Sequence, residues 1–151
     1  MRPTLTPLLA LATTVTAISN QVIRNYCPEG KFITLLLNQT GVDGPFLLPS
    51  GQAYEYAING TGNSVTVANV AADFGAAVPR LDLGTSTNNG IIYWAVNNLT
   101  GDPFADSNFN VTSSGKNENV CQSCVGYDKQ VHACIDNDVT LFLSLCTINV
   151  A

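Results

Sequence analysis

The sequence predicts an all-β protein, a small antiparallel β-sandwich stabilised by disulfides. Three observations support this prediction. Short runs of β-prone residues are separated by turns rich in Gly, Pro and Asn. No segment has the apolar periodicity of a long amphipathic helix. The 151 residues include five cysteines, and 46% of them are hydrophobic, which is enough for the core of one domain.

The N-terminus has the pattern of a secretory signal peptide. Arg2 gives a short positive region, residues 7–12 (PLLALA) are apolar, and Val15-Thr16-Ala17 is a small-residue cleavage site. The apolar stretch is too short to cross a bilayer as a helix. We therefore predict a signal peptide at 1–17 and a secreted, extracellular domain at 18–151.

The charge of the chain excludes two classes of partner. Eleven acidic and six basic residues give a net charge of −5, and cleavage after residue 17 removes Arg2 and leaves 5 − 11 = −6. A chain this acidic does not favour nucleic acid or anionic membranes. No apolar run after the signal is long enough for a membrane helix. The partners we expect are extracellular proteins or cell-wall glycans.

The first half of the domain contains four candidate strands, which are residues 21–26, 31–37, 52–58 and 64–70. Pro28 and Gly30 break the chain between the first two. Residues 38–51 are rich in turn formers, and we expect a loop there. The last two candidates are joined by Asn-Gly-Thr-Gly-Asn, which favours a hairpin.

The second half contains two further candidates, residues 90–96 and 139–145. The last is the clearest, because one face carries Val139, Leu141, Leu143 and Leu145. Residues 71–77 can form a helical turn, but Gly75 and Pro79 oppose a longer helix. We therefore expect a helix content well below about a fifth.

Four segments together resemble a known family. Residues 22–36 (VIRNYCPEGKFITLL) are similar to the opening strand pair of thaumatin-like proteins. Residues 48–54 (LPSGQAY) resemble their Leu-x-x-Gly-Gln-x-aromatic motif, with Tyr54 in place of the usual Trp. Residues 93–104 (YWAVNNLTGDPF) and 134–146 (CIDNDVTLFLSLC) make the chain most similar to the small fungal yeast-phase-specific (Bys-type) secreted proteins, a reduced thaumatin-like branch. The chain lacks most of the cysteines of plant thaumatin-like proteins. The resemblance implies a thaumatin-like sandwich without an established enzymatic activity, and some members are discussed as effectors that act on a host.

The resemblance also implies the disulfide pairing. A bridge from Cys27 to Cys146 ties the first strand to the last. Cys134 pairs with Cys124 or Cys121, and we prefer Cys124 because the shorter loop resembles the terminal bridge of the family. One of the five cysteines is then left over. It stays a free thiol in a monomer or joins two chains in a dimer.

His132 is the only histidine and lies in a polar connection between cysteines. No Gly-x-Ser-x-Gly motif accompanies it, so we expect an exposed loop residue and not a hydrolase base. The Cys121-x-x-Cys124 motif admits a zinc site with His132 and Cys134, but oxidation in the secretory pathway favours disulfides. We therefore predict no catalytic residue, no cofactor and no metal site.

The remaining candidate residues lie outside the clearest strands. Asp102 and Asp106, near the Gly-Asp-Pro-Phe turn, are tentative binding residues, and the competing interpretation is that Asp simply caps a turn there. The candidate N-glycosylation sites are four Asn-x-Thr sequons, at Asn38, Asn59, Asn98 and Asn110.

Two functions stay open. The first is a secreted, non-enzymatic interaction protein, a fungal effector that binds a host or cell-wall partner. The alternative is a binder of cell-wall β-glucan, or a weak glucanase, that uses an acidic cleft. A cleft with two carboxylates and an exposed aromatic side chain would favour the alternative, whereas a smooth, glycosylated sandwich would favour the first.

Overall fold

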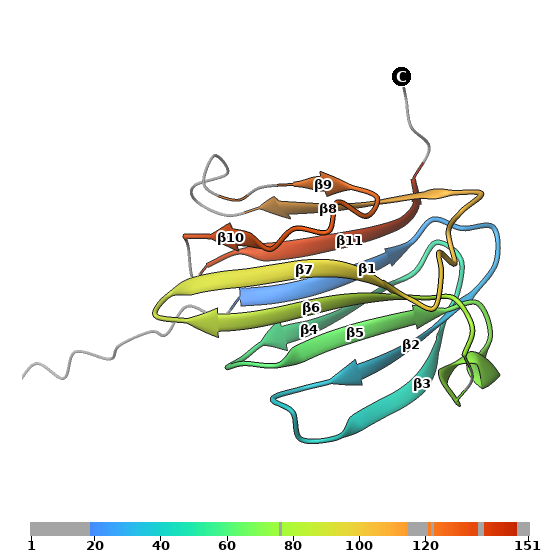
Figure 1. Cartoon of the computed structure of the whole chain (residues 1–151), viewed down its shortest axis with the longest axis horizontal. Helices are drawn as coiled ribbons and strands as arrows, with labels where there is room; N and C mark the ends of the chain where they lie inside the picture. Colours follow the sequence, from blue (N-terminus) through green and yellow to red (C-terminus); the bar gives the residue numbers. More distant parts are fainter. Residues whose placement is uncertain (1–18, 76, 115–120, 122, 136–137, 148–151) are drawn as a thin grey trace, which may run out of the picture.

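Two β-sheets pack face to face in the computed structural model, which describes residues 19–75, 77–114, 121, 123–135 and 138–147 (Figure 1). The predicted signal peptide, residues 1–17, lies outside the described residues. Among the residues described, the only helical element is a 3-10 turn, η1 (Ala71–Gly75). No helix in this part of the chain is long and apolar enough to cross a membrane.

One sheet has five strands, in the spatial order β4 (Ala53–Ile58), β1 (Ser19–Asn25), β11 (Thr140–Thr147), β8 (Asn108–Ser114) and β9 (Cys124–Val125). The other has six strands, in the order β10 (His132–Cys134), β7 (Ile91–Leu99), β6 (Arg80–Asn88), β5 (Asn63–Ala68), β2 (Lys31–Leu36) and β3 (Val42–Leu48). All pairs are antiparallel except β1 with β11, which run parallel. The predicted all-β, disulfide-stabilised sandwich is confirmed.

The core lies between the sheets because each strand turns alternate side chains inward. On β11, Leu141, Leu143 and Leu145 are fully buried. Trp94 on β7 is 1% exposed and belongs to the core. On β4 the two tyrosines face inward, and the Tyr56 hydroxyl donates a hydrogen bond to Gln21 Oε1 at 2.6 Å.

Five strands lie where the sequence analysis placed none, namely β3, β6, β8 and the short strands β9 and β10. β6 and β8 turn apolar residues inward, but polar residues and glycine alternate with them and weaken the local β signal. The sequence analysis expected a loop at 38–51, and this expectation is wrong because the segment contains β3. Gly44 and Pro45 lie within β3, and every residue from Val42 to Leu47 is exposed, so neither propensity nor burial marked it as a strand.

The structure contains two disulfides. Cys27 is bonded to Cys146, the pair that the family resemblance implied, and the bridge follows directly from the parallel β1–β11 pairing. Cys134 is bonded to Cys121 and not to Cys124, so the preferred pairing is wrong. The reason is geometric. Cys121 forms an isolated β-bridge opposite Cys134, whereas Cys124 belongs to β9 in the other sheet and keeps a buried, free thiol.

Candidate functional site

An open depression of about 600 Å³ lies beside the Cys27–Cys146 disulfide. Glu29, Asp106 and Lys31 are among its lining residues. The Lys31 ammonium donates a hydrogen bond to Asn69 Oδ1 at 2.8 Å, which holds the cation at the wall of the depression. We call this feature the disulfide depression. It places Asp106, one of the two tentative binding residues, at a concave surface.

Asp102, the other tentative binding residue, has a different environment. Its Oδ1 accepts a hydrogen bond from the Phe104 backbone N–H at 2.8 Å, the arrangement by which Asp stabilises a turn. It is not among the residues that line the disulfide depression. Burial and then the Asp102 carboxylate raise the pKa of Tyr127. The structure therefore gives Asp102 a turn-capping role beside Tyr127.

The strand β3 forms a second candidate surface, at the edge of the six-stranded sheet. Three of its apolar side chains are exposed: Val42 by 65%, Leu47 by 58% and Phe46 by 40%. Asp43 is exposed beside them. The Phe46 ring stacks on Tyr54 of β4, with centroids 6.1 Å apart, and so touches the other sheet. We call Val42, Asp43, Phe46 and Leu47 the β3 surface.

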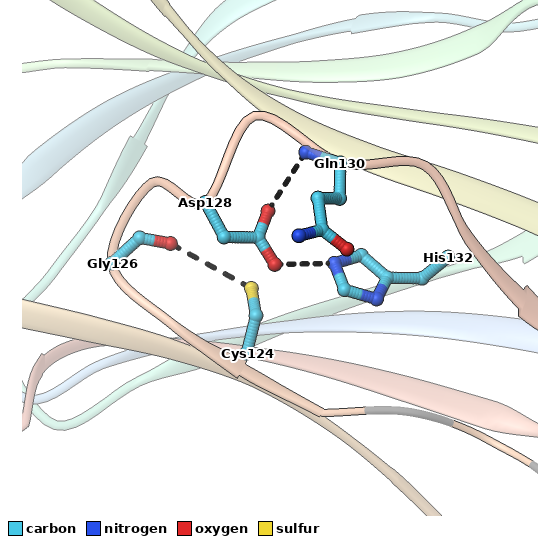
Figure 2. A network of polar contacts seen from close by, with 5 residues as sticks. All are labelled: Cys124, Gly126, Asp128, Gln130 and His132. Atoms are coloured by element: carbon cyan, nitrogen blue, oxygen red, sulfur yellow. Dashed lines mark hydrogen bonds and ion pairs between the residues drawn. The ribbon is translucent and has the colours of Figure 1, made fainter.

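A third feature is a polar cluster of Cys124, Asp128 and His132 (Figure 2). The His132 Nε2 atom lies 2.7 Å from Asp128 Oδ2. One ligand atom from each of the three residues lies within 4.8 Å of the other two. The Cys124 Sγ also lies 3.6 Å from the Gly126 carbonyl oxygen. These are the residue types that bind transition metals.

The turn between β9 and β10 brings the cluster together. Gly126 (φ 68°) and Lys129 (φ 59°) adopt left-handed backbone conformations, which reverse the chain between Cys124 and His132. The Gln130 backbone N–H donates to Asp128 Oδ1 at 3.0 Å and holds the carboxyl group in place (Figure 2). The three residues are four apart, a spacing that would place them on one face of a helix. Here two short strands and the turn between them bring the residues together, and the sequence analysis predicted neither strand.

His132 is not the exposed loop residue that the sequence analysis expected. It lies in β10, is 5% exposed, and its ring stacks on Trp94 with centroids 4.1 Å apart. The β10–β7 pairing places His132 directly opposite Trp94. The polar residues around His132 in the sequence therefore gave no sign that its side chain is buried.

The thiol in this cluster is not set up as a nucleophile. Burial and then the Asp128 carboxylate raise the pKa of Cys124 to about 11. Reactive cysteines instead have lowered pKa values and lie near positive charge. The cluster consequently offers three donor atoms without the electrostatics of a cysteine hydrolase.

The four predicted glycosylation sites differ in accessibility. Asn38, Asn59 and Asn98 are exposed. Asn110 lies on β8 between β11 and β9, and its side-chain oxygen is enclosed without a hydrogen-bond partner. The first three positions are therefore more accessible to a glycan on the folded domain than Asn110, which is half-buried.

Comparison with known proteins places this fold in a family. The sequence model of the family described as Bys1, Blastomyces yeast-phase-specific protein, matches residues 8–147. The chain belongs to the Bys1 family. No match was found among curated proteins.

Two solved structures are similar to this Bys1-family chain. One is the protein elicitor MoHrip2 from Magnaporthe oryzae, with a TM-score of 0.69, 17% identity, and coverage of 85% of this chain and 99% of that one. The other is the thaumatin-like xylanase inhibitor TLXI, with a TM-score of 0.58, 16% identity, and coverage of 84% and 99%. At these identities the likeness shows the fold, which is thaumatin-like.

Proposed function

We propose that this protein is a secreted, non-enzymatic interaction protein that binds an extracellular protein through the β3 surface. The observation that supports this most is the exposure of three large apolar side chains, Val42, Phe46 and Leu47, on one edge strand. Val42 and Leu47 share the outer face of the sheet, because their partners on β2, Leu36 and Phe32, are four residues apart. Contiguous exposed apolar surface marks protein contacts. The exposed Asp43 and the net charge of −5 favour a basic partner.

The names of the two similar structures support the same class of function. One is described as a protein elicitor and the other as a xylanase inhibitor, and both descriptions concern action on other proteins or cells. The proposal for this chain includes an effector role at a host surface. It also includes secretion directed by residues 1–17, with glycans at Asn38, Asn59 and Asn98. Peptide mapping of the secreted protein would test the cleavage site and the glycans together.

A binding experiment tests the β3 surface. The secreted, glycosylated protein would be cross-linked in host extracellular fluid, and each captured protein would be purified and titrated against it. We expect Leu47→Asp to abolish binding, because a carboxylate replaces an apolar contact at the interface. Val131→Asp is the matched control, since Val131 is also exposed, by 71%, next to the opposite edge strand β10. The assignment of binding to the β3 surface would be contradicted if both variants lost binding equally, or if neither variant lost it.

A second candidate function is binding of a cell-wall glycan in the disulfide depression. The specific observation is that Glu29 and Asp106 line this depression and that Tyr26 is 56% exposed. Tyr26 lines a second hollow, and Cys146 is a lining residue of both. Carboxylates that accept sugar hydroxyls and an aromatic ring that stacks on a pyranose are the usual elements of a glycan site.

Binding to insoluble β-1,3-glucan distinguishes the two functions. If the depression is the site, Tyr26→Ala and Glu29→Gln weaken binding to the glucan and Leu47→Asp does not. Hydrolysis of the same polymer should stay at the level without protein, because we propose no catalytic role for Glu29 or Asp106. If the wild-type protein releases sugar from the polymer and Asp106→Asn abolishes this release, the protein is a glucanase instead.

A further inference from the structure

We propose that Cys124, Asp128 and His132 form a zinc-binding site that joins the edges of the two sheets. The sequence analysis considered zinc only with Cys134, which the structure places in a disulfide. The present site uses a different cysteine and a carboxylate that no motif marked. The inference goes beyond the proposed function and does not depend on it, because the site lies on β9, on β10 and in the turn between them.

The donor set fits zinc in number and kind. Zinc is bound in proteins by thiolate, imidazole and carboxylate groups, at about 2.3 Å for sulfur and about 2.0–2.2 Å for nitrogen and oxygen. Tetrahedral angles then separate two ligand atoms by about 3.2–3.6 Å. The three atoms here lie within 4.8 Å of one another, and the His132–Asp128 contact is 2.7 Å. Shifts of about 1 Å or less therefore bring them to zinc geometry, with water as the fourth ligand.

The surrounding residues already orient two of the ligands. The Gln130 N–H binds Asp128 Oδ1, which leaves Oδ2 directed at His132 (Figure 2). The Trp94 ring stacks on the imidazole at an interplanar angle of 20° and fixes its plane. Outer contacts of this kind are what tune and orient metal ligands in known sites. Two of the three ligands are also shielded, since Cys124 and His132 are 7% and 5% exposed.

Metal binding at this place has a structural consequence. Zinc binding through His132 Nε2 uses the neutral imidazole with its proton on Nδ1, and it displaces the proton of the Cys124 thiol to solvent. Cys124 lies on β9, the edge of the five-stranded sheet, and His132 on β10, the edge of the six-stranded sheet. The bound ion consequently connects the two sheets beside the Cys121–Cys134 disulfide.

The composition of the chain makes the site easy to detect. There is one histidine and one free cysteine, so a signal from imidazole or thiolate ligation has one source each. The secreted protein, with its disulfides intact and metal removed by chelator, would be titrated with Co²⁺ and then with Zn²⁺. We expect one equivalent of Co²⁺ to give visible bands of tetrahedral intensity and a sulfur-to-cobalt charge-transfer band, both of which Zn²⁺ bleaches.

Two variants and a control locate the binding. Asp128→Asn keeps the side-chain shape and Cys124→Ser keeps a small polar group. Each should weaken zinc binding by about 100-fold or more, because loss of even an outer contact costs 10- to 100-fold. Glu55→Gln is the control, since this exposed carboxyl group lies on β4, the edge of the five-stranded sheet opposite β9. Zinc binding that both variants leave unchanged would overturn the proposal.

A thermal measurement keeps the test informative if a variant folds poorly. Zinc should raise the unfolding temperature of the wild-type protein in a concentration-dependent way, and it should not do so after alkylation of Cys124. Thiol mapping of the same sample completes the test. Absence of a zinc-dependent shift, or a mature protein in which Cys124 is already disulfide-bonded, would also overturn the assignment.

Discussion

Asp82 is a half-buried carboxyl group that contributes to the pH dependence of stability. It lies on β6 opposite Thr66, whose hydroxyl donates a hydrogen bond to Asp82 Oδ1 at 2.8 Å. Burial raises the pKa of Asp82 above its ordinary value of 3.8, although hydrogen bonds from Thr66 and Ser64 and the charge of Arg80 act in the opposite direction. The folded state therefore binds this proton more tightly than the unfolded chain does.

Replacing Asp82 by Asn should stabilise the protein at neutral pH. Because the pKa is raised on folding, the wild-type residue contributes fully to stability below pH 3.8 and loses that contribution as the pH rises through the folded value. Asp82→Asn removes the buried charge and keeps an acceptor for Thr66. Urea unfolding from pH 3 to about pH 8 should show an advantage of the variant that disappears toward acid. The exposed Asp43→Asn is the control, and an advantage that grows toward acid would contradict the mechanism.

At the scale of single residues, the sequence showed burial where the neighbouring residues are apolar and missed it where they are polar. Trp94 was recognisable as a core residue because it lies in an apolar run. His132 was not, because its neighbours are polar and its burial comes from a partner strand 38 positions away in the chain, where Trp94 lies (132 − 94 = 38). The Cys121–Cys134 disulfide likewise depends on the isolated β-bridge that places these two residues opposite each other. Pairing across strands is a tertiary property that local patterns do not contain.

At the scale of elements, β11 and β3 differ most in their position within the sheet and in the burial of their side chains. β11 lies in the middle of the five-stranded sheet, and its Leu141, Leu143 and Leu145 are fully buried. β3 is an edge strand with a single buried residue, Leu48. The same amino acid should therefore contribute very different amounts to stability in these two strands.

A matched pair of substitutions measures this difference. Leu143→Ala should lower the free energy of unfolding by about 2–5 kcal/mol, because it leaves a cavity between the sheets. Leu47→Ala removes the same atoms from a side chain that is 58% exposed and should change stability by about 0.5 kcal/mol or less. Chemical denaturation gives both values. Similar losses for the two variants would mean that the β3 surface is covered in the free protein.

The same contrast explains which strands the sequence could predict. β11 has leucine at every second position, at Leu141, Leu143 and Leu145, and the pattern alone placed the strand within one or two residues. β3 has no inward face for most of its length, so its strand conformation depends on pairing with β2 and not on its own residues. β6 had the alternation, with Leu81 and Leu83 inward, but its glycine and threonines resembled a loop.

At the scale of the whole molecule, two disulfides act over very different lengths of chain. Cys27 and Cys146 are 119 residues apart, whereas Cys121 and Cys134 are 13 apart. In the chain-entropy model the longer closure restricts the unfolded state more strongly. The Cys27–Cys146 bridge should therefore stabilise the folded protein more than the Cys121–Cys134 bridge does.

Removing each bridge separately tests that order. Cys27→Ala/Cys146→Ala should cost up to about 5 kcal/mol of unfolding free energy, and Cys121→Ala/Cys134→Ala about 3 kcal/mol. Alanine is needed at both Cys27 and Cys121, because serine would create new glycosylation sequons after Asn25 and Asn119. Denaturant unfolding of the secreted variants gives the comparison. A larger loss from the shorter bridge would contradict the entropic account.

The parallel pairing of β1 with β11 also determines when this domain can fold. A chain leaves the ribosome from its N-terminus onward, and segments that pair locally can begin to fold during synthesis. Here the strand that emerges first among those described must wait for the one that emerges last, and that last strand occupies the middle of its sheet. In the other sheet, β2 pairs with β3, and β5, β6 and β7 pair in sequence order, so these five strands can pair earlier. The five-stranded sheet is therefore completed only after β11 has been made, because β11 joins the β1–β4 pair to β8.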